Sequence, residues 1–150
     1  MPTRLDLSLQ FTDSKAAVEH KAQVTRAKAH RWMSAALEGD AEITVRIVGE
    51  AEGRVLNRQY RGKDYATNVL TFDYAREPVV MADLVLCAPV VAREARAQRK
   101  PLAEHYAHLM IHGTLHAQGW DHETSDADAE AMETLESLLM LSLGLPDPYA

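Results

Sequence analysis

The sequence predicts a single α+β domain in which a mixed β-sheet is covered by helices. The chain has 150 residues, of which 47% are hydrophobic and 25% charged, as expected for one globular domain. Segments with the period of a strand alternate with helical segments through the first two thirds of the chain, and only helical segments follow. Because no repeat, linker or low-complexity tract divides the chain, we expect one domain over residues 1–150.

The first strand and the first helix are expected close to the N-terminus. Residues 5–11 alternate apolar with polar side chains, which is the period of a half-buried strand. Asp13 or Ser14 can then cap a helix that runs to about Leu37, and Gly39 can end it.

Three more strands and a short helix are expected in the central part. Residues 41–48 alternate again, and the two further strand candidates are residues 68–72 and 83–87, with Pro78 in a loop between them. Residues 51–60 suit a short helix, and a polar loop follows it at 61–64. The side chains of this helix that we expect to point inward are Val55, Leu56 and Tyr60.

Prolines and glycines delimit the helices of the last third. Pro89 lies near the start of one helix, where its missing N–H costs little. A second helix, over about 101–118, opens at a proline and ends at Gly119. A last helix spans about 126–143 and stops at Gly144. Its expected buried stripe consists of Met132, Leu135, Leu138 and Leu139.

The composition excludes several classes of protein. No apolar run approaches the roughly 18 residues of a membrane span, and the N-terminus lacks the apolar centre of a signal peptide. Cys87 is the single cysteine, so an internal disulfide is impossible, and we expect it to be a small core residue. A cytoplasmic location is therefore expected.

Charge is unevenly placed along the chain. The net charge is −6, yet residues 101–150 hold nine acidic side chains and no Lys or Arg, so all 16 basic residues precede them. Two basic groups could meet a polyanion, although charge alone favours a solvated helix face for each. They are Arg54, Arg58, Arg61 and Lys63, and Arg93, Arg96, Arg99 and Lys100.

The motif that carries chemistry is HxxxHxxGxxH at residues 112–122. His112 and His116 are four apart on a helix, so their imidazoles can meet one cation. Gly119 allows a left-handed reversal of the backbone, which brings His122 back to the same point. Three neutral imidazoles leave a fourth tetrahedral position open, which is typical of a catalytic zinc site. An open site can activate water or polarise a phosphoryl or carbonyl oxygen.

Neighbouring residues leave alternatives open. His108 and His112 form a competing pair, but only His112 and His116 have His122 within reach. We interpret His105 and His108 as surface histidines or as hydrogen-bond partners behind the ligands. Imidazole also accepts nickel, copper and iron, so the spacing alone leaves the metal open. Acidic residues that could accept a hydrogen bond from a ligand histidine are Asp83, Asp121 and Glu123.

The same spacing occurs in the metzincin proteases, HExxHxxGxxH, with one difference. Gly113 stands where those enzymes have the glutamate that acts as general base. The motif therefore predicts metal binding and argues against peptide hydrolysis by that mechanism.

These residues resemble the YbeY family, bacterial metal-dependent endoribonucleases of ribosomal RNA maturation. The resemblance covers roughly residues 40–140. It is carried by HGTLHAQGWDH at 112–122, METLE at 132–136, LNRQYRGKD at 56–64, ATNVLTF at 66–72 and DLVLC at 83–87. Three positions depart from the family pattern. Trp120 stands where tyrosine is usual, Thr71 where serine is common, and Ala82 where glycine is usual.

The resemblance implies a metal site and a fold. The metal ligands would be His112, His116 and His122, and the metal one zinc ion per chain, with another divalent metal left open. Arg61 matches the functionally important arginine of the family. The implied fold is a small α+β domain with a mixed four-stranded sheet and the metal site at the end of a long helix.

The resemblance also implies an activity and partners. The activity is single-strand-specific RNA cleavage in 16S rRNA 3′-end processing, ribosome biogenesis and quality control. The implied partners are single-stranded RNA and rRNA, together with the small ribosomal subunit and its assembly proteins. Neither DNA nor a membrane is expected as a partner.

A mechanism follows as a hypothesis. We expect His112 and Arg61 to be the catalytic residues, because Arg61 can present a planar fork to a phosphate while the metal activates water or polarises a phosphoryl oxygen. Arg58 and Lys63 are expected to bind flanking phosphates. No residue is identifiable as the general base. Two alternatives stay open: a metzincin-like peptidase or amidase, and a non-catalytic small-subunit assembly factor with a structural metal.

Overall fold

Four strands form one mixed sheet in the computed structural model, which describes residues 3–121 and 123–150. The strands are β1 (Leu5–Phe11), β2 (Ala41–Val48), β3 (Val69–Ala75) and β4 (Val80–Cys87). Their order is β1-β2-β4-β3; β1 and β4 run parallel to β2, and β3 runs antiparallel to β4. The predicted fold is confirmed, although β3 and β4 are longer than the sequence predicts and turn tightly around Pro78.

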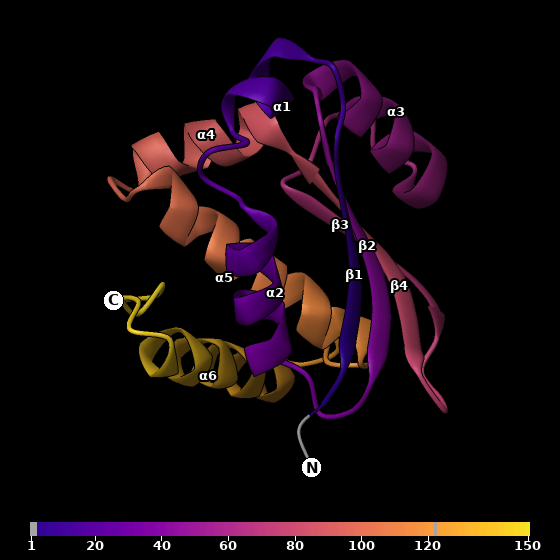
Figure 1. Cartoon of the computed structure of the whole chain (residues 1–150), viewed down its shortest axis with the longest axis vertical. Helices are drawn as coiled ribbons and strands as arrows, with labels where there is room; N and C mark the ends of the chain where they lie inside the picture. Colours follow the sequence, from indigo (N-terminus) through magenta and orange to yellow (C-terminus); the bar gives the residue numbers. More distant parts are fainter. Residues whose placement is uncertain (1–2, 122) are drawn as a thin grey trace.

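Helices cover both faces of the sheet unequally (Figure 1). One face carries α1 (Lys15–Glu19), α2 (Arg26–Ala35), α4 (Ala88–Ala97), α5 (Leu102–Ala117) and α6 (Asp126–Ser142). On the other face, within the described part of the chain, lies the single helix α3 (Glu50–Arg61), which packs against β4. The long helix α5 lies between the sheet and α6, so its two sides meet different partners.

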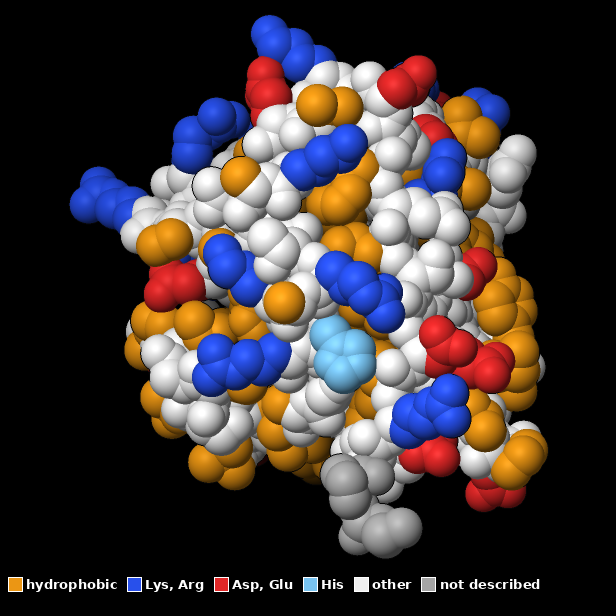
Figure 2. Space-filling model, in the orientation of Figure 1, with side chains coloured by type: hydrophobic (Ala, Val, Ile, Leu, Met, Phe, Trp, Pro, Cys, Tyr) orange, Lys and Arg blue, Asp and Glu red, His pale blue; other side chains and the backbone are white. Residues whose placement is uncertain are grey.

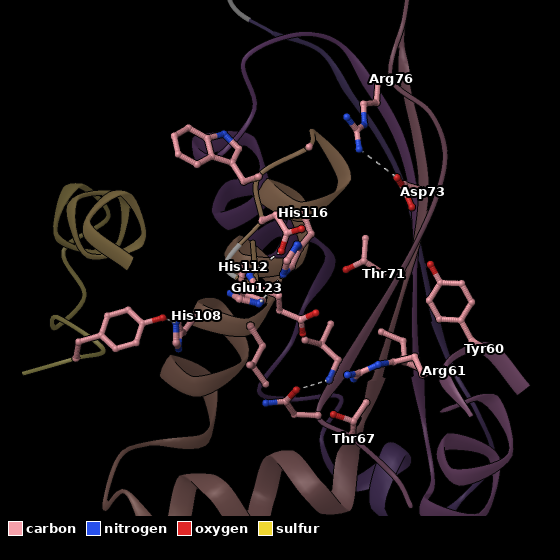
Figure 3. Close-up of a pocket in the computed structure, with 18 residues that line it drawn as sticks. Tyr60, Arg61, Thr67, Thr71, Asp73, Arg76, His108, His112, His116 and Glu123 are labelled. Carbon is pink, nitrogen blue, oxygen red and sulfur yellow. Dashed lines mark hydrogen bonds and ion pairs between the residues drawn. The ribbon is translucent and has the colours of Figure 1, made fainter. Parts of the chain in front are cut away.

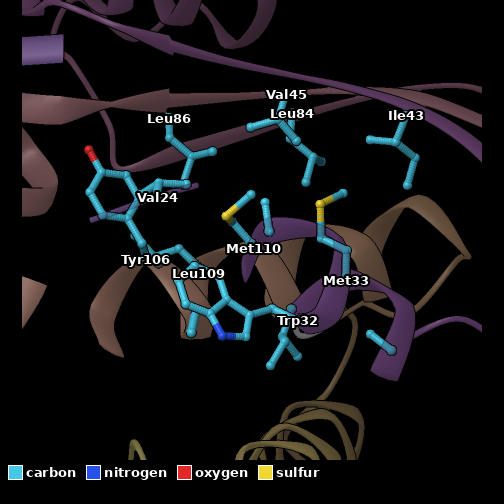
Figure 4. Packing of buried hydrophobic residues seen from close by; sticks show 14 of the residues in the cluster. Val24, Trp32, Met33, Ile43, Val45, Leu84, Leu86, Tyr106, Leu109 and Met110 are labelled. Carbon is cyan, nitrogen blue, oxygen red and sulfur yellow. The ribbon is translucent and has the colours of Figure 1, made fainter. Parts of the chain in front are cut away.

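The main core lies between the sheet and the pair α2 and α5 (Figure 4). Leu84 of β4, Met33 of α2 and Met110 of α5 are all fully shielded from solvent there. Truncating such a side chain to alanine typically costs about 2–5 kcal/mol. This packing holds α5 at a fixed height over β3 and β4, which matters because α5 carries the histidine motif.

The predicted single helix from Asp13 or Ser14 to Leu37 is wrong, because two helices occupy this stretch. Ser14 does cap α1, accepting a hydrogen bond from the Ala17 N–H, but α1 ends at Glu19. His20 then turns its ring into the core, where its Nδ1 and the Tyr106 hydroxyl share a 2.6 Å hydrogen bond. Thr25 caps α2 afresh.

Gly39 does not end α2. This helix ends at Ala35, with Ala36 as its C-cap in ordinary right-handed geometry, and Gly39 lies in the following turn. Because the end of α2 needs no residue in the left-handed conformation, the position of the next glycine does not mark where this helix ends.

Three side chains predicted to point inward are exposed. Val55 and Tyr60 of α3 are 41% and 52% exposed, and only Leu56 of the predicted trio packs against a core cluster. Since α3 covers a small cluster, its contact stripe is narrow and centred on Gly53 and Asn57. Leu138 of α6 is 60% exposed because α6 packs mainly against α5.

Basic side chains stand apart on the face formed by α1, α2 and β1. Figure 2 shows Lys and Arg spread across this face, with acidic side chains mainly toward its margins. They do not merge into one large patch in this view. Within the two described ranges, none of the helices is both long and apolar enough to cross a membrane.

Candidate functional site

A cavity of about 640 Å³ opens between α5 and the edge strand β3 (Figure 3). Its walls come from the end of α3, from β3, from α5 and from the segment that follows α5. The labelled histidines lie on one side of the cavity, and Arg61 and Tyr60 lie on the other. The polar side chains that line it include Tyr60, Arg61, Thr67, Asn68, Thr71, Asp73, Arg76, His108, His112, His116, Asp121, Glu123 and Tyr149.

His112 and His116 converge in this cavity as the spacing predicts. Their Nε2 atoms are 3.1 Å apart, and their rings stand nearly perpendicular, at 81°. One turn of α5 separates them, so both imidazoles leave the helix on the same side. Two imidazole nitrogens this close form a natural pair of metal ligands, because one ring has only to give up the proton that they share in the hydrogen bond.

The separation of the two described histidine nitrogens fits two corners of a tetrahedral metal site. Ligand nitrogens about 2.0–2.1 Å from one ion lie about 3.3–3.4 Å from each other, close to the separation of the two Nε2 atoms. The third predicted ligand, His122, lies outside the described residues. Among residues 3–121 and 123–150 there is no group of three His, Cys, Asp or Glu side chains that could hold a metal. The three-histidine site therefore stays a prediction.

Gly119 makes the turn that the motif requires. Its φ is +103°, in the region that favours glycine, and it directly follows the C-cap of α5. An added Cβ at this position would come within 2.8 Å of the Arg76 guanidinium. The left-handed conformation predicted at Gly119 is thus confirmed.

Gly113 occupies a position that faces the sheet rather than the cavity. A Cβ built there would lie 3.0 Å from both terminal carbons of Leu84. The residue after the first histidine is therefore pressed against β4. A glutamate side chain at this position would have to enter the apolar core, so α5 cannot supply a protease-type general base in this packing.

Glu136 of α6 is a fully buried carboxylate behind the histidine pair. Its Oε2 accepts a hydrogen bond from the Nδ1 of His112 at 3.2 Å. Its Oε1 accepts from the Nε2 of His108 at 2.6 Å and from the Tyr149 hydroxyl at 2.8 Å. Burial alone would raise the pKa of Glu136, but hydrogen bonds from His108 and His112 outweigh it and lower that pKa to about 2. The group is therefore charged at neutral pH.

This carboxylate determines the protonation of His112. A carboxylate only accepts hydrogen bonds, so the Nδ1 of His112 must carry its proton. In the neutral ring, Nε2 is then left with its lone pair, and that atom is the one that faces His116 in the cavity. Glu136 thereby prepares His112 to bind a cation.

The interpretation of His105 and His108 as surface residues is wrong, whereas a supporting role behind His112 agrees with the contacts of His108. His105 and His108 are 2% and 9% exposed. His105 Nε2 donates to Glu94 at 2.8 Å, and Glu94 also accepts from the amide of Asn68 at 3.0 Å. Because Asn68 directly precedes β3, the bond from His105 to Glu94 helps to fix the cavity wall that faces α5.

The predicted phosphate-binding residues lie in different places. Arg61 is in the last turn of α3 rather than in a loop, and it lines the cavity. Arg58 lies one turn earlier, outside the cavity, 3.9 Å from the Asp64 carboxylate. Lys63 is exposed and is not among the lining residues.

The acidic residues singled out from the sequence make the following contacts. Asp83 accepts a hydrogen bond from the Tyr74 hydroxyl at 2.8 Å. Asp121 accepts from the Glu123 N–H at 2.8 Å, and both residues line the cavity. Sequence reasoning missed Glu136 as a partner of the histidines. The signal that could have revealed it is an acidic residue spaced four from each of two buried methionines, Met132 and Met140.

Comparison with known proteins gives a consistent result. The family model "Endoribonuclease YbeY" matches residues 8–144. The protein of that name from Delftia acidovorans is 65% identical over 147 residues, which cover 98% of this chain and 97% of the relative. The one from Albidiferax ferrireducens is 60% identical and covers 99% of this chain and 100% of the relative. The solution structure of TM1509 from Thermotoga maritima is 26% identical, with a TM-score of 0.56 and 91% of each chain covered.

Proposed function

The chain belongs to the YbeY endoribonuclease family, and we propose that its histidine pair and Arg61 form the site at which it cleaves single-stranded RNA. The chain is an endoribonuclease, and ribosomal RNA processing is the role of its family. Beyond this, the proposal names the metal, the residues that contact RNA and the RNA that is cleaved. We infer that the substrate is small-subunit rRNA near its 3′ end, bound on or beside the small ribosomal subunit in the cytoplasm.

We propose that one zinc ion is held by His112, His116 and His122. When bound, such an ion supplies positive charge to a phosphodiester transition state and lowers the pKa of water. The chain's own residues prepare the site for it. Glu136 keeps the proton of His112 on Nδ1, and the packing of Gly113 against the sheet fixes the direction from which the histidine side chains enter the cavity.

Arg61 is proposed to bind and orient the scissile phosphate. Its guanidinium can donate two parallel hydrogen bonds to phosphate oxygens, and these strengthen as negative charge builds up in the transition state. Arg58 and Lys63 lie outside the cavity, so they would reach only phosphates further along the strand. We therefore expect Arg61 to affect catalysis and the other two to affect binding.

One observation carries this proposal. Two imidazole Nε2 atoms, 3.1 Å apart, line the same cavity as the arginine that matches the family pattern. Nitrogen ligands for a cation and a phosphate-binding fork therefore share one space. That combination stabilises the negative charge that develops when a phosphodiester is hydrolysed.

The test is cleavage of a small-subunit rRNA precursor with added zinc, combined with elemental analysis of the purified protein. Wild type is expected to hold about one metal ion per chain. His116→Ala should lose both metal and cleavage. Arg61→Ala should keep the metal and cleave at least about 100-fold more slowly. Lys28→Ala removes an exposed basic side chain of α2 outside the cavity, so it is the control and should cleave at the wild-type rate. Normal cleavage by Arg61→Ala would refute its role.

The packing of Gly113 argues against the peptidase or amidase alternative, and casein hydrolysis assayed beside RNA cleavage tests it directly. The assembly-factor alternative is tested in cells. If Arg61→Ala, with its metal and without cleavage, fully restores ribosome maturation in a strain that lacks the wild-type chain, binding rather than cleavage is the main role.

A further inference from the structure

We propose that Tyr60, supported by Phe72, is a stacking site for an unpaired base of the RNA substrate. The inference rests on the proposed function, because it assumes that an RNA strand enters the cavity. It adds a contact with a nucleobase to the contact with phosphate already assigned to Arg61.

Tyr60 presents an aromatic ring on a firm support. Its side chain is 52% exposed, yet its ring packs on Phe72 with centroids 4.4 Å apart and planes tilted by 54°. Phe72 in turn packs against the smaller core cluster under α3, around Val85 and Leu70. The ring is therefore held from one side and open on the other, which is the arrangement that a stacking platform needs.

The position of the ring places it at the mouth of the cavity. β3 is an edge strand, and Thr71 and Asp73 line the cavity while Phe72 points to the opposite face. Tyr60 lines the cavity and also packs on Phe72, so it lies where the cavity continues around the edge of the sheet. Tyr60 directly precedes Arg61, and Figure 3 shows both on the side opposite the histidines.

The surroundings of the ring favour RNA over an apolar protein partner. Arg61 lies next to it, and no described residue forms an ion pair with that guanidinium at short range. Tyr74, a further tyrosine on β3, is 66% exposed and bonded to Asp83 rather than covered by apolar side chains. An exposed ring beside a guanidinium suits a base and its phosphate. In a duplex the base faces are already stacked, so this contact also discriminates in favour of single strands.

The test measures binding of a 2′-O-methyl oligoribonucleotide, which resists cleavage, by fluorescence anisotropy at one fixed salt concentration. Tyr60→Ala should weaken binding by about 5- to 150-fold, the usual range for loss of one stacked base. Tyr60→Phe keeps the ring and should stay within about twofold of wild type. Tyr65→Ala is the matched control, because Tyr65 is 55% exposed but does not line the cavity. Wild-type affinity in Tyr60→Ala would overturn the proposal.

Removing the base instead of the ring gives an independent arm. A series of oligonucleotides, each with one abasic position at a different place, should include one that binds wild type more weakly than the intact strand. Tyr60→Ala should bind that oligonucleotide and the intact strand equally well. Equal losses in both proteins would show that the ring contacts no base. If Tyr60→Ala folds poorly, the test is photo-crosslinking of RNA that contains 4-thiouridine to the wild-type protein. The crosslink should map to Tyr60. A crosslink that maps elsewhere would overturn the proposal.

The outcomes separate this inference from the proposed function. If wild type neither binds nor cuts single-stranded RNA, the proposed function itself fails. If wild type cuts RNA and Tyr60→Ala binds it equally well, only the stacking site is wrong. If Tyr60→Ala keeps its affinity for RNA but loses affinity for the small ribosomal subunit, the ring contacts protein and the proposal is overturned.

Discussion

Replacing Glu136 by glutamine should weaken metal binding, although the new side chain has almost the same shape. Three donors point at the carboxylate: His108 and Tyr149 toward Oε1, and His112 toward Oε2. A glutamine can keep two of these hydrogen bonds by placing its carbonyl oxygen at the Oε1 position. Its NH₂ group then faces His112, whose Nδ1 must become an acceptor. The proton of that ring moves to Nε2, the atom that faces His116, and blocks it as a ligand.

The expected loss of affinity is about 10- to 100-fold, the usual effect of removing a hydrogen-bond partner from a ligand histidine. The rearrangement also leaves a buried group imperfectly paired, so the free energy of unfolding should fall by about 1–3 kcal/mol. Tyr149→Phe removes one donor and leaves both histidines on the carboxylate, and it should therefore have a smaller effect on zinc affinity.

The assay is competition for zinc against a chelator of known affinity at neutral pH, with urea unfolding in parallel. Glu133→Gln is the matched control, since it makes the same substitution at an exposed position one turn earlier on α6. Wild-type zinc affinity in folded Glu136→Gln would refute the argument that this carboxylate sets the tautomer of His112.

Three other substitutions test the local arguments. Gly119→Ala should lower the free energy of unfolding in urea by about 1–2 kcal/mol, because φ is +103° and the new Cβ would press on Arg76; an unchanged urea midpoint would contradict this. Gly113→Glu should cost more than about 3 kcal/mol in thermal unfolding, because it drives a charge against Leu84, and it should create no casein hydrolysis. Burial lowers the pKa of His20 below its ordinary value of 6.5. The neutral ring therefore contributes its full stabilisation above pH 6.5, and this is lost as the pH falls through the pKa of the folded state. In that range the free energy of unfolding should fall by at most about 1.4 kcal/mol per pH unit. His20→Phe should flatten that part of the stability profile, and parallel profiles for the two proteins would exclude the assignment.

Local signals predicted most of the framework. Alternation of apolar and polar residues located β1 and β2, and prolines and glycines located the ends of α4, α5 and α6. These features depend on neighbouring residues in the chain, so the sequence carries them directly. The convergence of His112 and His116 belongs to the same class, because a separation of four on a helix fixes which side chains meet.

Features that depend on what lies across the molecule were missed. The break between α1 and α2 follows from the burial of His20 against Tyr106, which is 86 residues away. The exposure of Tyr60 follows from the small size of the cluster that α3 covers. Amphipathic spacing shows that a helix has an apolar side, but not how wide a surface its partner offers.

Glu136 shows how such a partner could be recognised. Met132, Glu136 and Met140 are the buried residues of α6, each four positions from the next, so the acidic residue lies in the middle of an apolar stripe. A buried carboxylate requires donors, and the neighbouring helix α5 carries histidines at the same spacing. Considered alone, the buried acid of one helix lacks hydrogen-bond donors, and the row of imidazoles on the other lacks acceptors. Packing the two helices together satisfies both, so the same contact that closes this side of the core also orients a proposed metal ligand.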